Sequence, residues 1–147
     1  MDWPGLVRKY VWDDEKTPYL VRSDRLRPGQ ARSELFVYAF LLAILAAVIV
    51  VVAAAGDGRV SPLASPEVAL YALTILAAAI VLGVSGHPVA AAYCATAPVA
   101  VGLGALAGVL RPDMGGAETL VLAALSVLWL GYAARIVRVA RRLHGQA

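Results

Sequence analysis

The chain has 147 residues, of which 61% are hydrophobic and 16% are charged, with a net charge of +3 and a mean hydropathy of +0.74. A soluble domain is about 45–50% apolar, and the excess here lies in long blocks, which excludes an ordinary soluble fold and indicates a membrane protein. The positive charges flank these blocks, so they do not indicate a nucleic-acid partner. The single cysteine, Cys94, excludes an intramolecular disulfide, a CxxC redox pair and a cysteine-rich zinc site.

Residues 1–34 are predicted to be a cytoplasmic N-terminal arm. Apolar residues fall at positions 3, 6, 7, 10 and 11, which is the spacing of a short amphipathic helix. Aromatic anchors beside charged groups are enriched at protein interfaces, so we expect this arm to dock on a partner. The membrane surface is the alternative partner for the same face. The predicted docking residues are Trp3, Leu6, Tyr10, Trp12 and Tyr19.

The first two apolar blocks predict transmembrane helices over residues 35–55 and 68–84. The first contains no charge, Pro or Gly over 21 residues, which as a helix extends about 31 Å, the thickness of a hydrocarbon core. Pro28 is a candidate first-turn residue for a helix that continues into this block. Ser65, Pro66 and Glu67 form a favourable helix start for the second block, with a capping hydroxyl, a first-turn proline and an acid at the positive helix end.

The third span is predicted over residues 88–110 and is rich in Ala and Gly. Pro98 lies inside it and is expected to kink the helix. Gly104 and Gly108 form a GxxxG pattern, with Gly102 beside them, and this pattern permits close approach of another helix in lipid. We therefore predict that this span packs on a second helix, of this chain or of another, through Pro98, Gly102, Gly104 and Gly108.

The fourth span is predicted over residues 119–137, with a basic cytoplasmic tail over residues 138–147. Arg135 is expected to extend its side chain to the interface. Arg138 and Arg142 follow it at helical spacing, with Arg141 alongside. We expect these four arginines to contact anionic lipid headgroups.

These blocks predict an all-α, polytopic integral membrane protein, with the four helices of residues 35–137 arranged as two hairpins. Seven Lys and Arg precede the first span and four lie in residues 135–147, at and beyond the end of the last span, but the two outer loops contain only Arg59 and Arg111. The positive-inside rule then places both termini in the cytoplasm. The Ala-, Val- and Arg-rich, Lys-poor composition indicates a bacterial source, and we expect the protein to lie in the plasma (inner) membrane.

No catalytic or cofactor motif is recognisable. Apart from Arg135, the predicted spans contain no charged side chain, and Glu34 is expected near the inner interface. His87 and His144 are candidate metal or haem ligands, but no carboxylate or Cys has useful spacing to His87. We therefore predict a protein that is not an enzyme and binds no cofactor or metal.

The sequence favours an accessory or scaffold subunit of a larger membrane complex. Spans of small residues pack closely on other helices, and the aromatic arm suits docking. The expected partners are membrane lipid and other membrane protein subunits. The alternative is a small oligomeric transporter or channel, although a proton-coupled exporter would be expected to hold an acid within a span.

Overall fold

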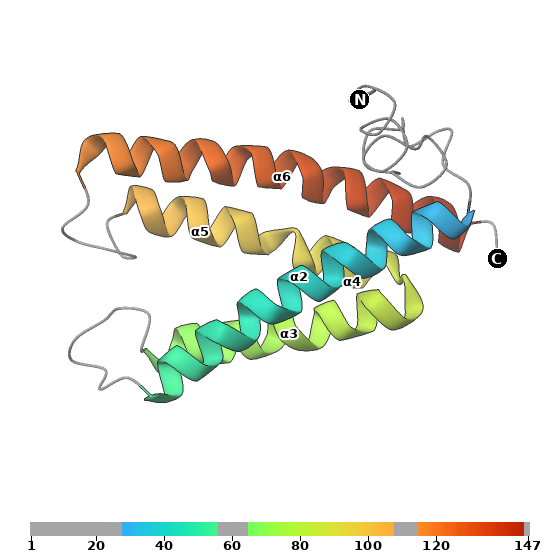
Figure 1. Ribbon diagram of the computed structural model, residues 1–147, viewed down its shortest axis with the longest axis horizontal. Helices are drawn as coiled ribbons and strands as arrows, with labels where there is room; N and C mark the ends of the chain where they lie inside the picture. The colour runs from blue at the N-terminus through green and yellow to red at the C-terminus, as the bar shows by residue number, and fades with distance from the viewer. Residues whose placement is uncertain (1–27, 56–64, 108–114, 146–147) are drawn as a thin grey trace, which may run out of the picture.

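The protein is described by a computed structural model over residues 28–55, 65–107 and 115–145. Within these ranges it is helical, without strands, and it has four helical segments that are long and apolar enough to cross a membrane. This confirms the predicted all-α membrane architecture (Figure 1). The helices are α2 (Pro28–Ala55), α3 (Pro66–Ser85), α4 (Pro88–Cys94), α5 (Thr96–Leu106) and α6 (Gly116–His144).

The two ends of the molecule differ in charge. At one end α2 and α4 begin and α3 and α6 end (Figure 1). We call this the arginine end, because the described arginines lie in the adjoining parts of α2 and α6. At the opposite, acidic end, Glu67 and Glu118 occupy the first turns of α3 and α6. The described arginines are Arg32, Arg135, Arg138, Arg141 and Arg142.

The ends of α3 follow from local chemistry. The Ser65 hydroxyl accepts a hydrogen bond from the Val68 N–H at 3.3 Å, and Pro66 and Glu67 occupy the first turn. The predicted helix start is therefore confirmed. The helix ends at Gly86, which has a φ of 63°, a left-handed conformation that is open to glycine without a steric penalty.

At the predicted kink the third span is interrupted at one residue, Ala95, which keeps right-handed helical dihedral angles (φ −71°, ψ −9°). Pro98 has no N–H to donate to the carbonyl of Cys94, and its ring would clash with that carbonyl in a regular helix. The chain breaks there, at Ala95, between α4 and α5. The Thr96 hydroxyl donates to the carbonyl of Tyr93 at 2.8 Å, which satisfies a backbone group beside the break.

The core is assembled from small and branched apolar side chains between neighbouring helices. α3 packs along α2, and α5 packs along α6 (Figure 1). The short α4 contacts both α3 and α6, and α2 contacts α6, so the two pairs are joined near the arginine end. The outward faces carry exposed Leu, Ile, Val and Phe side chains. Four apolar crossings place these faces in contact with lipid or with another membrane protein.

Candidate functional site

An ion pair joins α2 to α6 in the half of the molecule nearer the arginine end. Nε of Arg135 donates to Oε1 of Glu34 at 2.7 Å, and Nη2 donates to Oε2 at 3.1 Å. The Glu34 side chain is 0% exposed and the Arg135 side chain is 19% exposed. Such two-point contacts between guanidinium and carboxylate are short, strong and directional. They offset the large cost of removing both charges from water only when the geometry is good.

Glu34, predicted near the inner interface at the end of the arm, is a buried residue of the helix bundle. Because α2 begins at Pro28, Glu34 lies in its second turn, inside a candidate membrane span. It shares the buried face of α2 with Ala31, Leu35 and Tyr38. This helical spacing is the feature of the sequence that indicates burial of Glu34. The sequence does not predict that Arg135 pairs with Glu34, because the two residues are 101 positions apart along the chain.

An aromatic contact continues the interface between α2 and α6 one turn further along. The rings of Tyr38 and Tyr132 meet edge to face, with centroids 5.7 Å apart. Tyr38 is buried, and Tyr132 packs against the same core. Edge-to-face pairs contribute about 0.5–1.5 kcal/mol beyond their buried area. The ion pair and the tyrosines together fix the first helix against the last.

An apolar crevice of about 180 Å³ lies between the α2–α3 pair and the α5–α6 pair. It begins beyond the ion pair and extends toward the acidic end. Buried alanines from three helices, Ala46, Ala72 and Ala97, contribute to its walls. The crevice is lined by Leu42, Leu45, Ala46, Ile49, Val68, Tyr71, Ala72, Ile75, Ala97, Ala100, Val101, Gly104 and Trp129.

Two hydrogen-bonded pairs connect α3 to the broken third span. Thr74 donates to the carbonyl of Tyr71 at 2.7 Å, so its hydroxyl oxygen accepts the proton of Tyr93 at 2.8 Å. The Thr96 hydroxyl likewise donates to the carbonyl of Tyr93, so its oxygen accepts the hydroxyl proton of Tyr71 at 2.8 Å. Each hydroxyl is thereby satisfied inside the protein, as the low dielectric of a bilayer requires. These bonds hold one wall of the crevice.

The predicted packing residues of the third span have different surroundings. A Cβ atom built on Gly102 would lie 3.2 Å from Cβ of Ser126, so Gly102 permits close approach of α5 to α6 of the same chain. Gly104 lines the apolar crevice instead. Pro98 is buried beside the helix break. Gly108 lies outside the described residues.

The other predicted contacts concern the surface and the arm. Arg138, Arg141 and Arg142 are exposed in the last turns of α6, and Nε of Arg138 donates to the carbonyl of Ala134 at 3.3 Å. Arg135 has the carboxylate of Glu34 as a protein partner. The lipid contacts of these four arginines stay predictions. The arm residues Trp3, Leu6, Tyr10, Trp12 and Tyr19 lie outside the described residues.

The two histidines come together at the arginine end, although 57 positions separate them along the chain. The rings of His87 and His144 have centroids 5.2 Å apart and an interplanar angle of 62°. Nδ1 of His87 accepts the N–H of Val89 at 3.3 Å. In the ranges that the structure describes, no group of three or more His, Cys, Asp or Glu is arranged to hold a metal ion. Cys94 is fully buried, as expected for a small apolar side chain.

Comparison with known proteins found no matching family profile, no matching curated protein and no matching solved structure.

Proposed function

We propose that this protein is a non-catalytic accessory or scaffold subunit that binds a transmembrane helix of a larger membrane complex in its apolar crevice. The observation that carries the proposal is the crevice itself, which is lined by side chains of α2, α3, α5 and α6. A soluble substrate would require polar groups in such a site. Here the lining offers apolar contact over nearly all of its area, which suits a hydrophobic occupant within the bilayer.

The small residues of α5 favour a helix as that occupant. Ala97, Ala100 and Gly104 follow one another at helical spacing and line the crevice. Ala46 and Ala72 contribute small side chains from the other helix pair. Rows of small residues allow two helix backbones to approach closely, which is the main source of helix association in lipid. The side chains of the docking helix would fill the crevice while its backbone lies along the opening.

The ion pair supports a scaffold role rather than transport. Both oxygens of the Glu34 carboxylate bond Arg135, so the negative charge of this buried acid is already balanced by a cation of the same chain. The pair also joins α2 to α6 on one side of the crevice, which keeps the binding surface in place before a partner arrives. The alternative of a small oligomeric transporter or channel would need a conducting path formed between several copies.

We infer that the two-hairpin layout and the cytoplasmic location of both termini complete this arrangement in a bacterial plasma (inner) membrane. The segregation of arginines from Glu67 and Glu118 supports this orientation under the positive-inside rule. The N-terminal arm would then supply a second, cytoplasmic contact with the same partner complex. A docking helix would reach the crevice from within the membrane.

Site-specific photo-crosslinking tests the proposal. A photoreactive side chain at Ala100, which lines the crevice, should attach to one stoichiometric membrane partner after purification in mild detergent. Ala77 is the matched control, because it is an exposed alanine on α3 that does not line the crevice. Ala100→Leu should abolish co-purification of the partner, and Ala77→Leu should leave it intact. A homo-oligomer that crosslinks only to itself and moves a solute in liposomes would contradict the proposal.

A further inference from the structure

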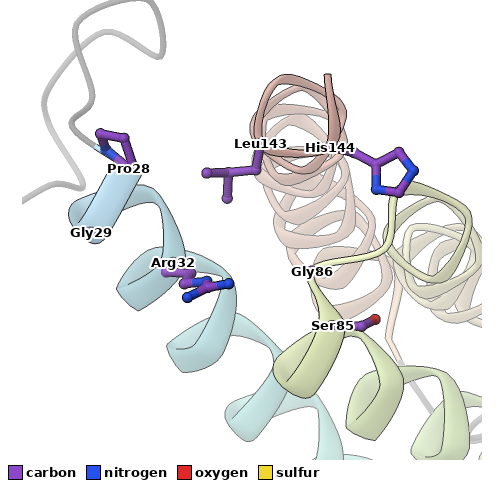
Figure 2. Close-up of a pocket in the computed structure, with 7 residues that line it drawn as sticks. All are labelled: Pro28, Gly29, Arg32, Ser85, Gly86, Leu143 and His144. Atoms are coloured by element: carbon purple, nitrogen blue, oxygen red, sulfur yellow. The ribbon is translucent and has the colours of Figure 1, made fainter. Parts of the chain in front are cut away.

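A second hollow, separate from the crevice, opens at the arginine end. Its volume is about 420 Å³, and it lies where α2 begins and α3 and α6 end (Figure 2). Figure 2 shows Arg32 extending from α2 toward the Ser85–Gly86 end of α3. The hollow is lined by Pro28, Gly29, Arg32, Ser85, Gly86, Leu143 and His144.

From these groups we propose that the hollow binds a phosphate group through Arg32 and His144. Arg32 is exposed, and within the described ranges no carboxylate bonds it. A planar guanidinium matches the geometry of a phosphate with two parallel N–H bonds. His144, which also lines the hollow at the end of α6, supplies a second donor. The volume of the hollow, about 420 Å³, is large enough to hold a phosphate.

The local charge favours an anion rather than a cation. Three acidic side chains lie in the described ranges: Glu34, which is fully engaged with Arg135, and Glu67 and Glu118, which are at the acidic end. The last turn of α6 contributes Arg141, Arg142 and His144, and cations there also face the negative end of the helix dipole. No described carboxylate therefore competes with a ligand for Arg32.

His87 positions the His144 ring, which is one of the two side chains proposed to bind the phosphate. The ring of His87 lies against the ring of His144, with centroids 5.2 Å apart. Because Nδ1 of His87 accepts the Val89 N–H, the proton of a neutral His87 ring is on Nε2. His87 itself is held at the turn that begins α4. It therefore restricts the orientation of the His144 ring at the rim of the hollow.

Two sources of phosphate share this chemistry. Basic pockets between transmembrane helices at the cytoplasmic surface bind the headgroups of anionic lipids. A soluble phosphate or phosphate ester could reach the same hollow from the water side. The proposal is independent of the crevice, so loss of helix docking would leave it standing, and loss of phosphate binding would not affect docking.

Binding to the purified full chain in a neutral detergent distinguishes these sources. Short-chain phosphatidylglycerol and inorganic phosphate are titrated separately, with intrinsic fluorescence or thermal stability as the signal. We expect saturable binding that Arg32→Gln weakens at least tenfold and His144→Gln weakens about threefold. Arg141→Gln is the matched control, because it removes the same charge from the same end outside the hollow. It should weaken binding of inorganic phosphate less than twofold, and it should weaken binding of the lipid, whose headgroup Arg141 is itself predicted to contact, less than Arg32→Gln does. Binding of the lipid alone identifies a headgroup site, and equal binding of inorganic phosphate identifies a soluble ligand.

Two results would overturn the site. One is the absence of saturable binding of either probe to the wild-type chain. The other is an equal loss of affinity in Arg32→Gln and Arg141→Gln, which would mean a diffuse surface charge effect. Arg32→Lys gives an additional measurement, because it keeps the charge but removes the two-point geometry, and it should restore only part of the affinity. Helical circular dichroism of each variant checks that the fold is retained.

Discussion

Replacing Glu34 by alanine removes the carboxylate that two of the three guanidinium nitrogens of Arg135 bond. Breaking a buried ion pair by removing one partner costs about 3–5 kcal/mol. Because 19% of the Arg135 side chain is exposed, water can partly replace the lost partner, and we expect the lower end of that range. Denaturation of Glu34→Ala with sodium dodecyl sulfate in mixed micelles, followed by circular dichroism, measures the change in unfolding free energy.

The double variant Glu34→Leu/Arg135→Leu is the control for this loss. It removes both charges, so neither is left unpaired, and apolar replacements of buried ion pairs are often neutral or stabilising. We expect the double variant to be more stable than Glu34→Ala alone. If Glu34→Ala is as stable as the wild type, the pair does not hold α2 against α6 in the way described above.

Gly102 permits a closer approach of two helices than any larger residue would allow. A side chain at this position would meet Ser126, which lies 3.2 Å from the position of its Cβ atom. We expect Gly102→Leu to lower the unfolding free energy by about 1–3 kcal/mol through overpacking. Gly131→Leu is the matched control, since nothing lies within 4 Å of its Cβ position. Equal stability of the two variants in the same detergent titration would refute the close packing of α5 on α6.

At the level of the element, the interruption at Ala95 is expected to depend on Pro98. In Pro98→Ala the new backbone N–H at position 98 can donate to the carbonyl of Cys94, so α4 and α5 should join into one helix. Spin labels at Val89 and Leu103, both exposed, report this change in a Cys94→Ala background. Their backbone separation should lengthen toward about 21 Å, the value for 14 residues of straight helix. An unchanged distance would show that tertiary contacts, and not the proline, maintain the break.

The sequence predicts the elements well wherever a local signal sets them. The length of each apolar run locates the four crossings, and the hydroxyl of Ser65 and the glycine at position 86 mark the ends of α3. Pro28 likewise marks the start of α2, as predicted for a first-turn proline. The burial of Glu34 is harder to read, because Arg32 and Ser33 are exposed on the same helix. The ion pair, the crevice and the meeting of His87 with His144 depend on how separate helices pack. Local composition does not determine such contacts.

At the scale of the whole molecule, the segregation of charge predicts its orientation. The chain has one cysteine, which is fully buried, so single cysteines introduced elsewhere can be labelled selectively. In intact cells an impermeant maleimide should label Glu67→Cys and Ala117→Cys, at the acidic end. It should label Gly29→Cys and His144→Cys, at the arginine end, only after the membrane is opened. If the impermeant maleimide labelled a cysteine at the acidic end and also one at the arginine end of intact cells, the two ends would lie on the same side of the membrane. That result would contradict four crossings.

The long separation between Glu34 and Arg135 also sets an order of events during biosynthesis. The carboxylate enters the membrane 101 residues ahead of its guanidinium partner, which at typical synthesis rates of 5–20 residues per second is an interval of about 5–20 s. The contact between α2 and α6 can therefore form only after α6 has been synthesised.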